Sequence, residues 1–377
     1  MTSQRLLPNP RTGFTRVVGV GGIGTGTIFA LQGNHTLGRN ESRLGAVIDA
    51  RDYCKLHIVE HYIAALLGLS ANHGTFEVIA IGNVGADPAG AMLVREMKQV
   101  GINTRYVRIE TESRTMFSTV FLYPDKSGGN ITAANSASSK LCTEQISECR
   151  HLLASAGARG VALCLPEVPL NRREEFLRVA ADCGNYRVAS FASAEMKSAC
   201  ESNLLAMVDL LALNREEAME LAGGHLRDPS RSQMLDACSG RAISMNPSMK
   251  ILVSAGPEGA YIFEKGHWSQ HHAIPVDAIS TVGAGDALLG GTIAGLIAGM
   301  PLANPEGSAP SGRKLIDSAV DLGLALAALS LTSPHTIHPE ADLETVLRFC
   351  ETKGLLLSSS VRQSVSTSHS KITSRRE

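Results

Sequence analysis

Short runs of β-branched and apolar residues alternate with amphipathic stretches along most of this chain. Examples of the runs, each close to a glycine-containing turn, are residues 16–20, 76–81, 160–165, 208–213 and 251–254. Strands that alternate with helices build βαβ units, which place a mostly parallel sheet between two helical layers. We therefore predict an α/β protein with a central sheet covered on both faces.

A different pattern occurs between about residues 105 and 134. Residues 116–123 alternate in the manner of a half-buried strand, and the turn 124–129 leads into a second extended run. This pattern predicts a β-hairpin. We expect a small β-lid formed by residues 105–134 and part of 22–50. An exposed apolar strand of this lid could pair with a second copy of the chain, so we expect a homodimer.

The ends of the chain lack the periodicity of the middle. We expect residues 1–15 to be a flexible N-terminus, 16–353 to be the folded domain, and 354–377 to be a disordered, serine-rich tail.

The composition excludes several classes of partner. With 35 Lys+Arg against 36 Asp+Glu, the chain has no positive field for nucleic acid or an anionic membrane surface. The longest apolar stretch, residues 287–300, is shorter than the roughly 20 residues of a membrane span. Residues 1–16 contain no apolar signal segment, and the eight cysteines contain no CxxC pair. We expect a cytoplasmic protein that acts on a small molecule.

A glycine-rich turn precedes the long apolar stretch. Residues 280–286 read Ser-Thr-Val-Gly-Ala-Gly-Asp. Backbone N–H groups of Gly283, Ala284 and Gly285 at a helix start suit a phosphate in transfer, because they are unpaired and lie at the positive end of the helix dipole. Asp286 is placed to take a proton from an attacking alcohol. The alternative is an ordinary helix start, with Asp286 favouring the dipole.

Several segments together resemble one enzyme family. The turn resembles the GAGD signature of the ribokinase-like (PfkB) carbohydrate kinases. Five further matches occur in the family's order, at residues 81–90, 101–104, 165–170, 213–218 and 253–260. The resemblance implies a three-layer ribokinase-like sandwich with a β-lid. It also implies an ATP-dependent phosphotransferase that acts on an alcohol group of a sugar or sugar-like metabolite.

The resemblance also assigns the nucleotide side of the site. It implies ATP and Mg²⁺ as cofactors, with nucleotide-binding residues at Asn214, Glu217, Ser254, Gly256, Gly259 and Thr281. Asn214 and Glu217 fit a water-mediated Mg²⁺ site on chemical grounds, because Mg²⁺ keeps several waters and prefers oxygen ligands. The alternative is a capping box, with Asn214 as N-cap and Glu217 as its partner. Ser280 stands where many relatives have an Asp that helps to bind a monovalent cation, so potassium activation is left open.

The acceptor side departs from the family pattern. Gly24 and Gly26 stand where the family's sugar-binding Asn and Asp are expected. Only Lys55 matches the family's next acceptor segment, so we assign the acceptor to Asp52, Lys55, His57 and Asn135. We expect standard sugars to be poor substrates and Lys55 to favour an anionic acceptor. The alternative for Lys55 and His57 is a solvated helix face; His57 and His61 also have the spacing of a metal-ligand pair.

Two other functions compete with the kinase. Residues 19–24 fit G-x-G-x-x-G, the fingerprint of nucleotide-cofactor oxidoreductases, but the polar, glycine-broken residues 32–40 do not continue a dinucleotide-binding unit. The missing acceptor residues also fit a non-catalytic kinase-fold protein that binds a metabolite. Asp286 and its two glycines argue against that second alternative.

Overall fold

A nine-stranded sheet lies at the centre of the protein. The computed structural model describes residues 3–10, 12–71, 76–125, 127–223, 229–304 and 315–368. Neighbouring strands run parallel except β12/β13 and β13/β14. In spatial order the strands are β14 (His267–His271), β13 (Ala260–Glu264), β12 (Lys250–Ser254), β11 (Leu210–Asn214), β10 (Tyr186–Ser190), β9 (Gly160–Cys164), β2 (Arg16–Val20), β5 (Glu77–Gly85) and β6 (Ile102–Glu110).

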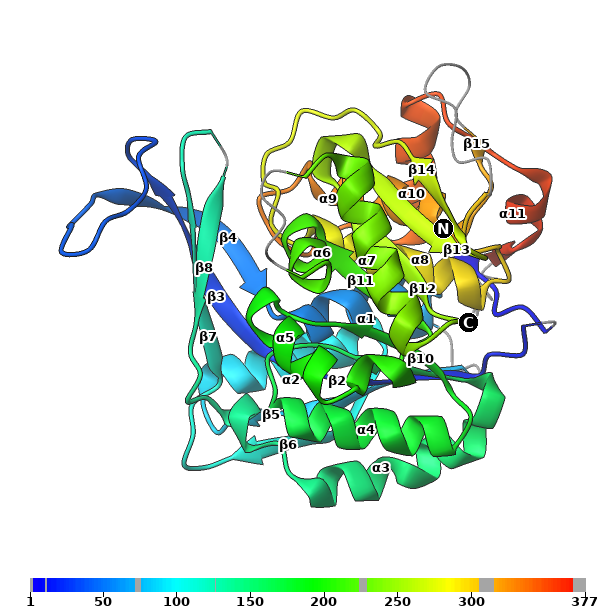
Figure 1. The fold of residues 1–377 in the computed structure, drawn as a ribbon, viewed down its shortest axis with the longest axis horizontal. Coiled ribbons are helices and arrows are strands. Elements are labelled where there is room, and N and C mark those ends of the chain that lie inside the picture. The colour runs from blue at the N-terminus through cyan, green and yellow to red at the C-terminus, as the bar shows by residue number, and fades with distance from the viewer. Residues whose placement is uncertain are drawn as a thin grey trace, which may run out of the picture.

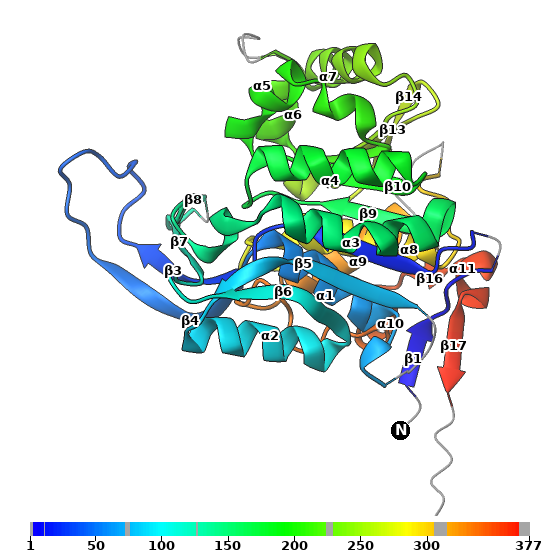
Figure 2. The same ribbon diagram turned by 90° about the horizontal axis from the view of Figure 1, so that it is seen from below.

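Helices cover both faces of this sheet, and each face has its own apolar core. Figure 2 shows α4 and α7 on one side of the sheet and α2 and α10 on the other. The first core includes residues of α1 (Lys55–Leu66), α2 (Pro88–Val100), α8 (Ala284–Ile297), α9 (Ala319–Ser330) and α10 (Leu343–Thr352). The second includes residues of α3 (Thr143–Ala156), α4 (Leu170–Asp182), α5 (Ser193–Glu201), α6 (Arg215–Leu221) and α7 (Arg231–Met245). The predicted three-layer α/β architecture is confirmed.

Local sequence signals set the ends of these helices. At the start of α2, the Asp87 side chain accepts a hydrogen bond from the Gly90 N–H at 2.8 Å, and Pro88 occupies the first helical position. Gly101 ends the same helix with φ 99°, a left-handed conformation that glycine adopts without strain. Short 3₁₀ helices occur at Leu69–Ala71, Ala137–Lys140, Gly157–Arg159, Leu204–Met207 and Gly256–Glu258.

A second, four-stranded sheet projects from one side of the molecule (Figure 1). Its order is β4 (Gly45–Tyr53), β3 (Gly24–Leu31), β7 (Met116–Leu122) and β8 (Gly128–Thr132). The antiparallel pair β7/β8 confirms the predicted hairpin, and β3 and β4 supply the predicted contribution from 22–50. The predicted limit of 105 was wrong, because residues 102–110 form β6 and pair with β5 in the main sheet. We call this four-stranded sheet the lid.

The lid carries apolar side chains that face solvent. Leu44, Val47, Phe117 and Ile131 are exposed large hydrophobic residues on its strands or next to them. Exposed apolar surface on a sheet with free edges favours pairing with another chain. The homodimer therefore stays a prediction, and the oligomeric state in solution would test it.

The two ends of the chain pair with each other, which differs from the predicted flexible N-terminus and disordered tail. Strand β1 (Ser3–Leu6) runs antiparallel to β17 (Val365–Ser368), and Leu6 and Val361 are each 1% exposed in the first core. Two further short elements, β16 (Leu356–Leu357), which pairs with β15 (Leu315–Ile316), and α11 (Ser359–Gln363), lie in the same region. Burial of these apolar side chains holds both ends in place. Residues 1, 2, 11 and 369–377 lie outside the described residues.

None of the described helices has the length and apolar character needed to cross a bilayer. All eight cysteines are unpaired, and Cys54, Cys149, Cys164, Cys238 and Cys350 are buried.

Candidate active site

Asp286 lies in the first turn of α8, where the sheet, α1 and the lid approach one another. The helix begins after Gly283, whose φ of 81° is left-handed, and a Cβ at that position would lie 2.7 Å from the Thr336 carbonyl oxygen. Glycine is therefore required at 283 by the backbone itself. The turn places Gly285 and Asp286 beside the carboxyl ends of the central strands, where open α/β sheets bind their ligands.

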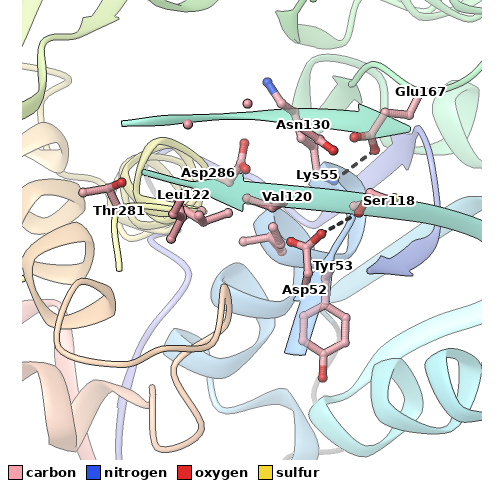
Figure 3. Close-up of a pocket in the computed structure, with 16 residues that line it drawn as sticks. Asp52, Tyr53, Lys55, Ser118, Val120, Leu122, Asn130, Glu167, Thr281 and Asp286 are labelled. Carbon is pink, nitrogen blue, oxygen red and sulfur yellow. Dashed lines mark hydrogen bonds between the residues drawn. The ribbon is translucent and has the colours of Figure 1, made fainter. Parts of the chain in front are cut away.

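A cavity of about 340 Å³ separates Asp286 from the lid. Figure 3 shows Asp286 and Lys55 among the residues that line it, together with Ser118, Val120 and Leu122 of the lid strand β7. Its other charged linings are Asp52 and Glu167. We call this space the acceptor cavity.

A second cavity, of about 230 Å³, lies on the other side of Asp286. Lys55 and Asp286 line both cavities. The other residues that line the second cavity lie on strands β10, β11 and β12 and near the starts of α6 and α8. They include Ser190, Asn214, Glu217, Ser254 and Gly285. We call this space the donor cavity.

The Lys55 ammonium lies among three carboxylates. Its Nζ is 3.7 Å from Glu217 Oε1. Burial alone would lower the pKa of Lys55, but Asp286, Glu217 and Glu167 raise it above its ordinary value. Conversely, burial raises the pKa of Asp286 to about 6 against the opposing effect of the Lys55 charge. Asp286 is thus ionised near neutral pH and is basic enough to accept a proton from an alcohol during attack.

Asp52 occupies the space that Gly26 leaves open. The two residues are cross-strand partners on β4 and β3, and a side chain at position 26 would collide with the Asp52 carboxylate and with Ser118. Ser118 donates a hydrogen bond to Asp52 Oδ2 at 2.5 Å, and Asp52 is 4% exposed. Burial raises its pKa, which the Ser118 hydroxyl partly offsets. A carboxylate therefore reaches the acceptor cavity from the neighbouring strand.

Glu167 is a site residue that the sequence did not identify. It follows β9 in the segment Leu-Pro-Glu and has φ 74°, an uncommon conformation for a non-glycine residue. Its Oε2 accepts a hydrogen bond from the Lys55 N–H at 3.2 Å. Burial, reinforced by Asp286, raises the pKa of Glu167 to about 7 against the effect of Lys55. The segment 165–170 resembled the family's stretch at the end of a central strand, and this was the signal available in the sequence, although no role was assigned to Glu167.

Asn214 and Glu217 form the capping box considered as an alternative. The Asn214 N–H donates to Glu217 Oε2, and the Glu217 N–H donates to Asn214 Oδ1, each at 2.8 Å. Both side chains also line the donor cavity, so the cap does not remove them from the site. No group of three or more metal-binding side chains occurs within the described ranges. This donor set fits a hydrated Mg²⁺ held through water, because Mg²⁺ is bound by few protein ligands.

Some of the other predicted site residues line one of the two cavities, and some line neither. Ser254 and Gly285 line the donor cavity, Gly283 and Thr281 line the acceptor cavity, and Ala284 is the first residue of α8. Gly256 and Gly259 flank the turn between β12 and β13, and neither lines the two cavities described here.

Two of the residues assigned to the acceptor, His57 and Asn135, do not line the acceptor cavity. His57 is buried on a different side of α1 and lines a separate cavity, because successive side chains point around the helix. Asn135 is exposed beyond β8 and does not line the acceptor cavity; Asn130, on β8 itself, does.

The α/β architecture and the two cavities that share an acid and a lysine fit the class of phosphotransferases. The family model of the pfkB family carbohydrate kinases matches residues 63–343, and the chain belongs to this family. It is accordingly an ATP-dependent kinase of the carbohydrate kinase class, as its resemblance to that family predicted.

The similar proteins agree with this membership. The ribokinase of Haemophilus influenzae is 26% identical over 277 residues, which cover 73% of this chain and 82% of that protein. The fructokinase of Klebsiella pneumoniae is 27% identical over 234 residues, 59% of this chain and 72% of that protein. Among solved structures, a ribokinase from Cryptococcus neoformans in complex with ADP has a TM-score of 0.68 at 17% identity, covering 89% of this chain and 99% of that one. A nucleoside kinase from Burkholderia thailandensis in complex with inosine has a TM-score of 0.64 at 16% identity, covering 90% and 99%. These two likenesses concern the fold, which is ribokinase-like.

Proposed function

We propose that this kinase transfers the terminal phosphoryl group of ATP to a hydroxyl group of an uncharged, sugar-like alcohol, with Asp286 as general base. The observation that carries the proposal is that Asp286 and Lys55 line both cavities. A phosphoryl group that passes from one cavity to the other must move past these two side chains. In-line transfer needs this arrangement, because attacking and leaving oxygens lie on opposite sides of the phosphorus.

Each group near this junction has a distinct part in the proposed step. Asp286 accepts the proton of the attacking hydroxyl, so that the oxygen becomes nucleophilic as the new O–P bond forms and the bond from the terminal phosphorus to the bridging oxygen of ATP breaks, which releases ADP. The N–H groups from Gly283 to Gly285 point from the start of α8 and stabilise charge on the transferring group. The Lys55 ammonium offsets negative charge at the junction. The lid excludes water, which would otherwise be a competing acceptor.

The donor cavity is proposed to hold ATP. Ser254 and Gly285 line it, and Asn214 and Glu217 would hold a Mg²⁺ ion through water. Mg²⁺ supplies charge neutralisation of the phosphates when it is bound. Glu217 is suited to this part because its Oε1 faces Lys55 while its Oε2 caps α6.

The charges of the acceptor cavity favour an uncharged acceptor. Asp52, Glu167 and Asp286 supply carboxyl groups, whereas Lys55 is the one cation among the described lining residues. An anionic acceptor would add like charge to this excess. We therefore propose an uncharged acceptor in place of the anionic one expected from Lys55 alone. Ile58, Val120 and Leu122 line the same cavity, so the acceptor is expected to carry an apolar edge as well as hydroxyl groups.

A panel of matched acceptors tests the function. ADP release would be measured with neutral sugars, deoxy sugars and nucleosides, each sugar paired with its sugar acid. We expect neutral compounds to exceed their acids by at least about tenfold in kcat/KM, equivalent to about 1.4 kcal/mol. Higher turnover of the acids would contradict the proposed acceptor class. A protein that binds members of the panel but never turns over ATP would instead be a non-catalytic binding protein.

The pH dependence of kcat/KM tests the role of Asp286. Because a general base must be ionised, and Asp286 has a raised pKa of about 6, activity should fall below about pH 6 by about tenfold per pH unit. Lys55→Met removes a charge that lowers this pKa, so the acidic limb should move to higher pH. Glu167→Gln is the matched control, because it removes the neighbouring carboxyl, whose pKa is about 7. In this variant kcat/KM should still begin to fall near pH 6. If Lys55→Met leaves the acidic limb of the kcat/KM profile at the same pH, Asp286 is not the general base.

A further inference from the structure

Three strands of the lid meet the main body of the protein at one level. Strand β3 begins at Gly24, which pairs with Met116 at the start of β7, and β4 ends at Tyr53. The returning end of the β7/β8 hairpin is held at the same level, because the Ala137 N–H donates to the Arg114 carbonyl at 2.8 Å. We call this level the base of the lid. Contacts at the base determine where the inner face of the lid stands over the acceptor cavity.

One carboxylate of the main body holds strand β7 at this base. Asp87 lies between β5 and α2, and its Oδ2 accepts a hydrogen bond from the Thr115 N–H at 2.8 Å, while its Oδ1 accepts one from the Thr115 hydroxyl at 2.7 Å. The Thr115 hydroxyl oxygen in turn accepts from the Gly85 N–H at 2.9 Å. Thr115 directly precedes β7 and is 6% exposed. We call these contacts of Gly85, Asp87 and Thr115 the clasp.

Two glycines leave room for the clasp. A Cβ at Gly85 would collide with the Thr115 nitrogen and lie 2.7 Å from Asp87 Oδ2, and a Cβ at Gly90 would lie 2.8 Å from Thr115 Oγ1. Burial raises the pKa of Asp87, but hydrogen bonds from Thr115 and Gly90 outweigh it and hold the pKa below its ordinary value. Asp87 is therefore an anion at neutral pH, and its hydrogen bonds to Thr115 belong to the stronger, charge-assisted class.

The clasp is close along the chain to the lid side chains that face the acceptor. Because side chains alternate along a strand, Ser118, Val120 and Leu122 share one face of β7, and all three line the acceptor cavity. A rotation of β7 about Thr115 would move this whole face relative to Asp286. A displacement of about 1 Å in such contacts can cost about a hundredfold in rate, even when the altered residue is far from the reacting atoms.

We propose that Asp87 is a positioning residue that acts through Thr115 to hold the inner face of the lid in place over the acceptor cavity. This role rests on the proposed function, because it takes that face as the cover of the acceptor. Without the clasp the acceptor binds more weakly and water reaches the site of transfer. The donor cavity is unaffected, since neither Asp87, Thr115 nor a residue of β7 belongs to its described lining.

Variants at two positions separate this role from the capping of α2, in which Asp87 also accepts from the Gly90 N–H. Asp87→Ser keeps a good N-cap residue but offers a single oxygen in place of two. Thr115→Val keeps the shape of threonine without the hydroxyl, and Thr115→Ser, which keeps the hydroxyl, is the matched control. We expect Asp87→Ser and Thr115→Val to raise the acceptor KM at least about tenfold and to leave the KM for ATP within about twofold. Thr115→Ser should stay close to the parent in both constants.

Entry of water gives a readout that a loss of stability would not move. ADP formation without an acceptor, divided by ADP formation with the best acceptor of the panel, should rise at least about tenfold in Thr115→Val. Partial unfolding would lower both rates together and leave their ratio unchanged. An acceptor KM and a ratio that both match the parent in Thr115→Val would refute the proposal.

Hydrogen exchange without substrates tests the clasp even if no member of the panel is phosphorylated, an outcome that would contradict the proposed function alone. Amides of β7 and β8 should exchange at least about fivefold faster in Thr115→Val, whereas those of β9 and β10 in the main sheet should change by less than about twofold. Unchanged exchange in the lid would show that the clasp does not hold it. An equal increase in β9 and β10 would show a general loss of stability, and either result would overturn the positioning role.

Discussion

The substitution Asp286→Asn is expected to lower kcat by at least about a hundredfold while the KM for ATP changes little. Asparagine keeps the shape of the side chain but cannot accept the proton of the attacking hydroxyl. The affinity for ATP should persist, because Asn214, Glu217 and Ser254 also line the donor cavity. Steady-state rates with the best acceptor of the panel would measure both effects.

The same substitution should stabilise the protein above pH 6. The folded pKa of Asp286, about 6, is raised from the ordinary value of 3.8, so the carboxyl favours folding below its unfolded pKa and loses this contribution as the pH rises through 6. Removing the charge should therefore raise the free energy of unfolding by at most about 3 kcal/mol at pH 8, and less to the extent that solvent reaches the carboxyl. Urea denaturation at pH 8 and pH 4 would measure the difference.

The kcat and the free energy of unfolding of Asp286→Asn together show whether Asp286 has a functional or a structural role. If the variant is inactive and at least as stable as the parent protein at pH 8, Asp286 serves catalysis in an environment that lowers the stability of the fold. An inactive but strongly destabilised variant would indicate a structural role, since loss of activity would then follow from unfolding. Near-normal turnover by a stable variant would remove Asp286 from the mechanism.

The sequence was sufficient for the architecture because its signals are local. The alternation of strand and helix patterns predicted the layered sheet, and residues 116–129 predicted the hairpin. The Gly-Ala-Gly-Asp turn predicted the start of α8. Each of these rests on hydrogen bonding, turn geometry or periodicity within about 20 residues.

The details of the acceptor site depend instead on contacts between distant segments. Asp52 fills the space at Gly26 because β4 pairs with β3, and no local pattern encodes that pairing. Glu167 enters the site from the end of β9, more than 100 residues from Lys55, whose N–H it accepts. His57 lines a different cavity from Lys55, because the spacing of residues on a helix does not reveal which face meets which cavity. The pairing of β1 with β17 was missed for the same reason, since short strands form only beside their partner.

The second large effect is expected from Gly285→Val, which should hinder phosphate binding without unfolding the protein. A Cβ at position 285 would meet only Ser254 Oγ, at 3.8 Å, and the residue lines the donor cavity. The added side chain would thus fit the folded chain but occupy the space where phosphate approaches the amides of α8. Loss of one such donor typically costs about a hundredfold to a thousandfold in rate, so kcat/KM for ATP should fall by at least about a hundredfold.

Gly283→Val is the matched control, because the same substitution two residues earlier should act on stability. Gly283 has φ 81°, and its Cβ would lie 2.7 Å from the Thr336 carbonyl oxygen, so strain and collision should lower the free energy of unfolding by about 1–3 kcal/mol. For Gly285→Val we expect a melting temperature within a few degrees of the parent, since a β-branched residue replaces glycine in the first turn of a helix at little cost. Thermal unfolding and ATP titration of the two variants would separate the effects. Full activity of a folded Gly285→Val protein, with an unchanged KM for ATP, would show that the phosphate does not approach this turn, and the donor site would then have to lie elsewhere.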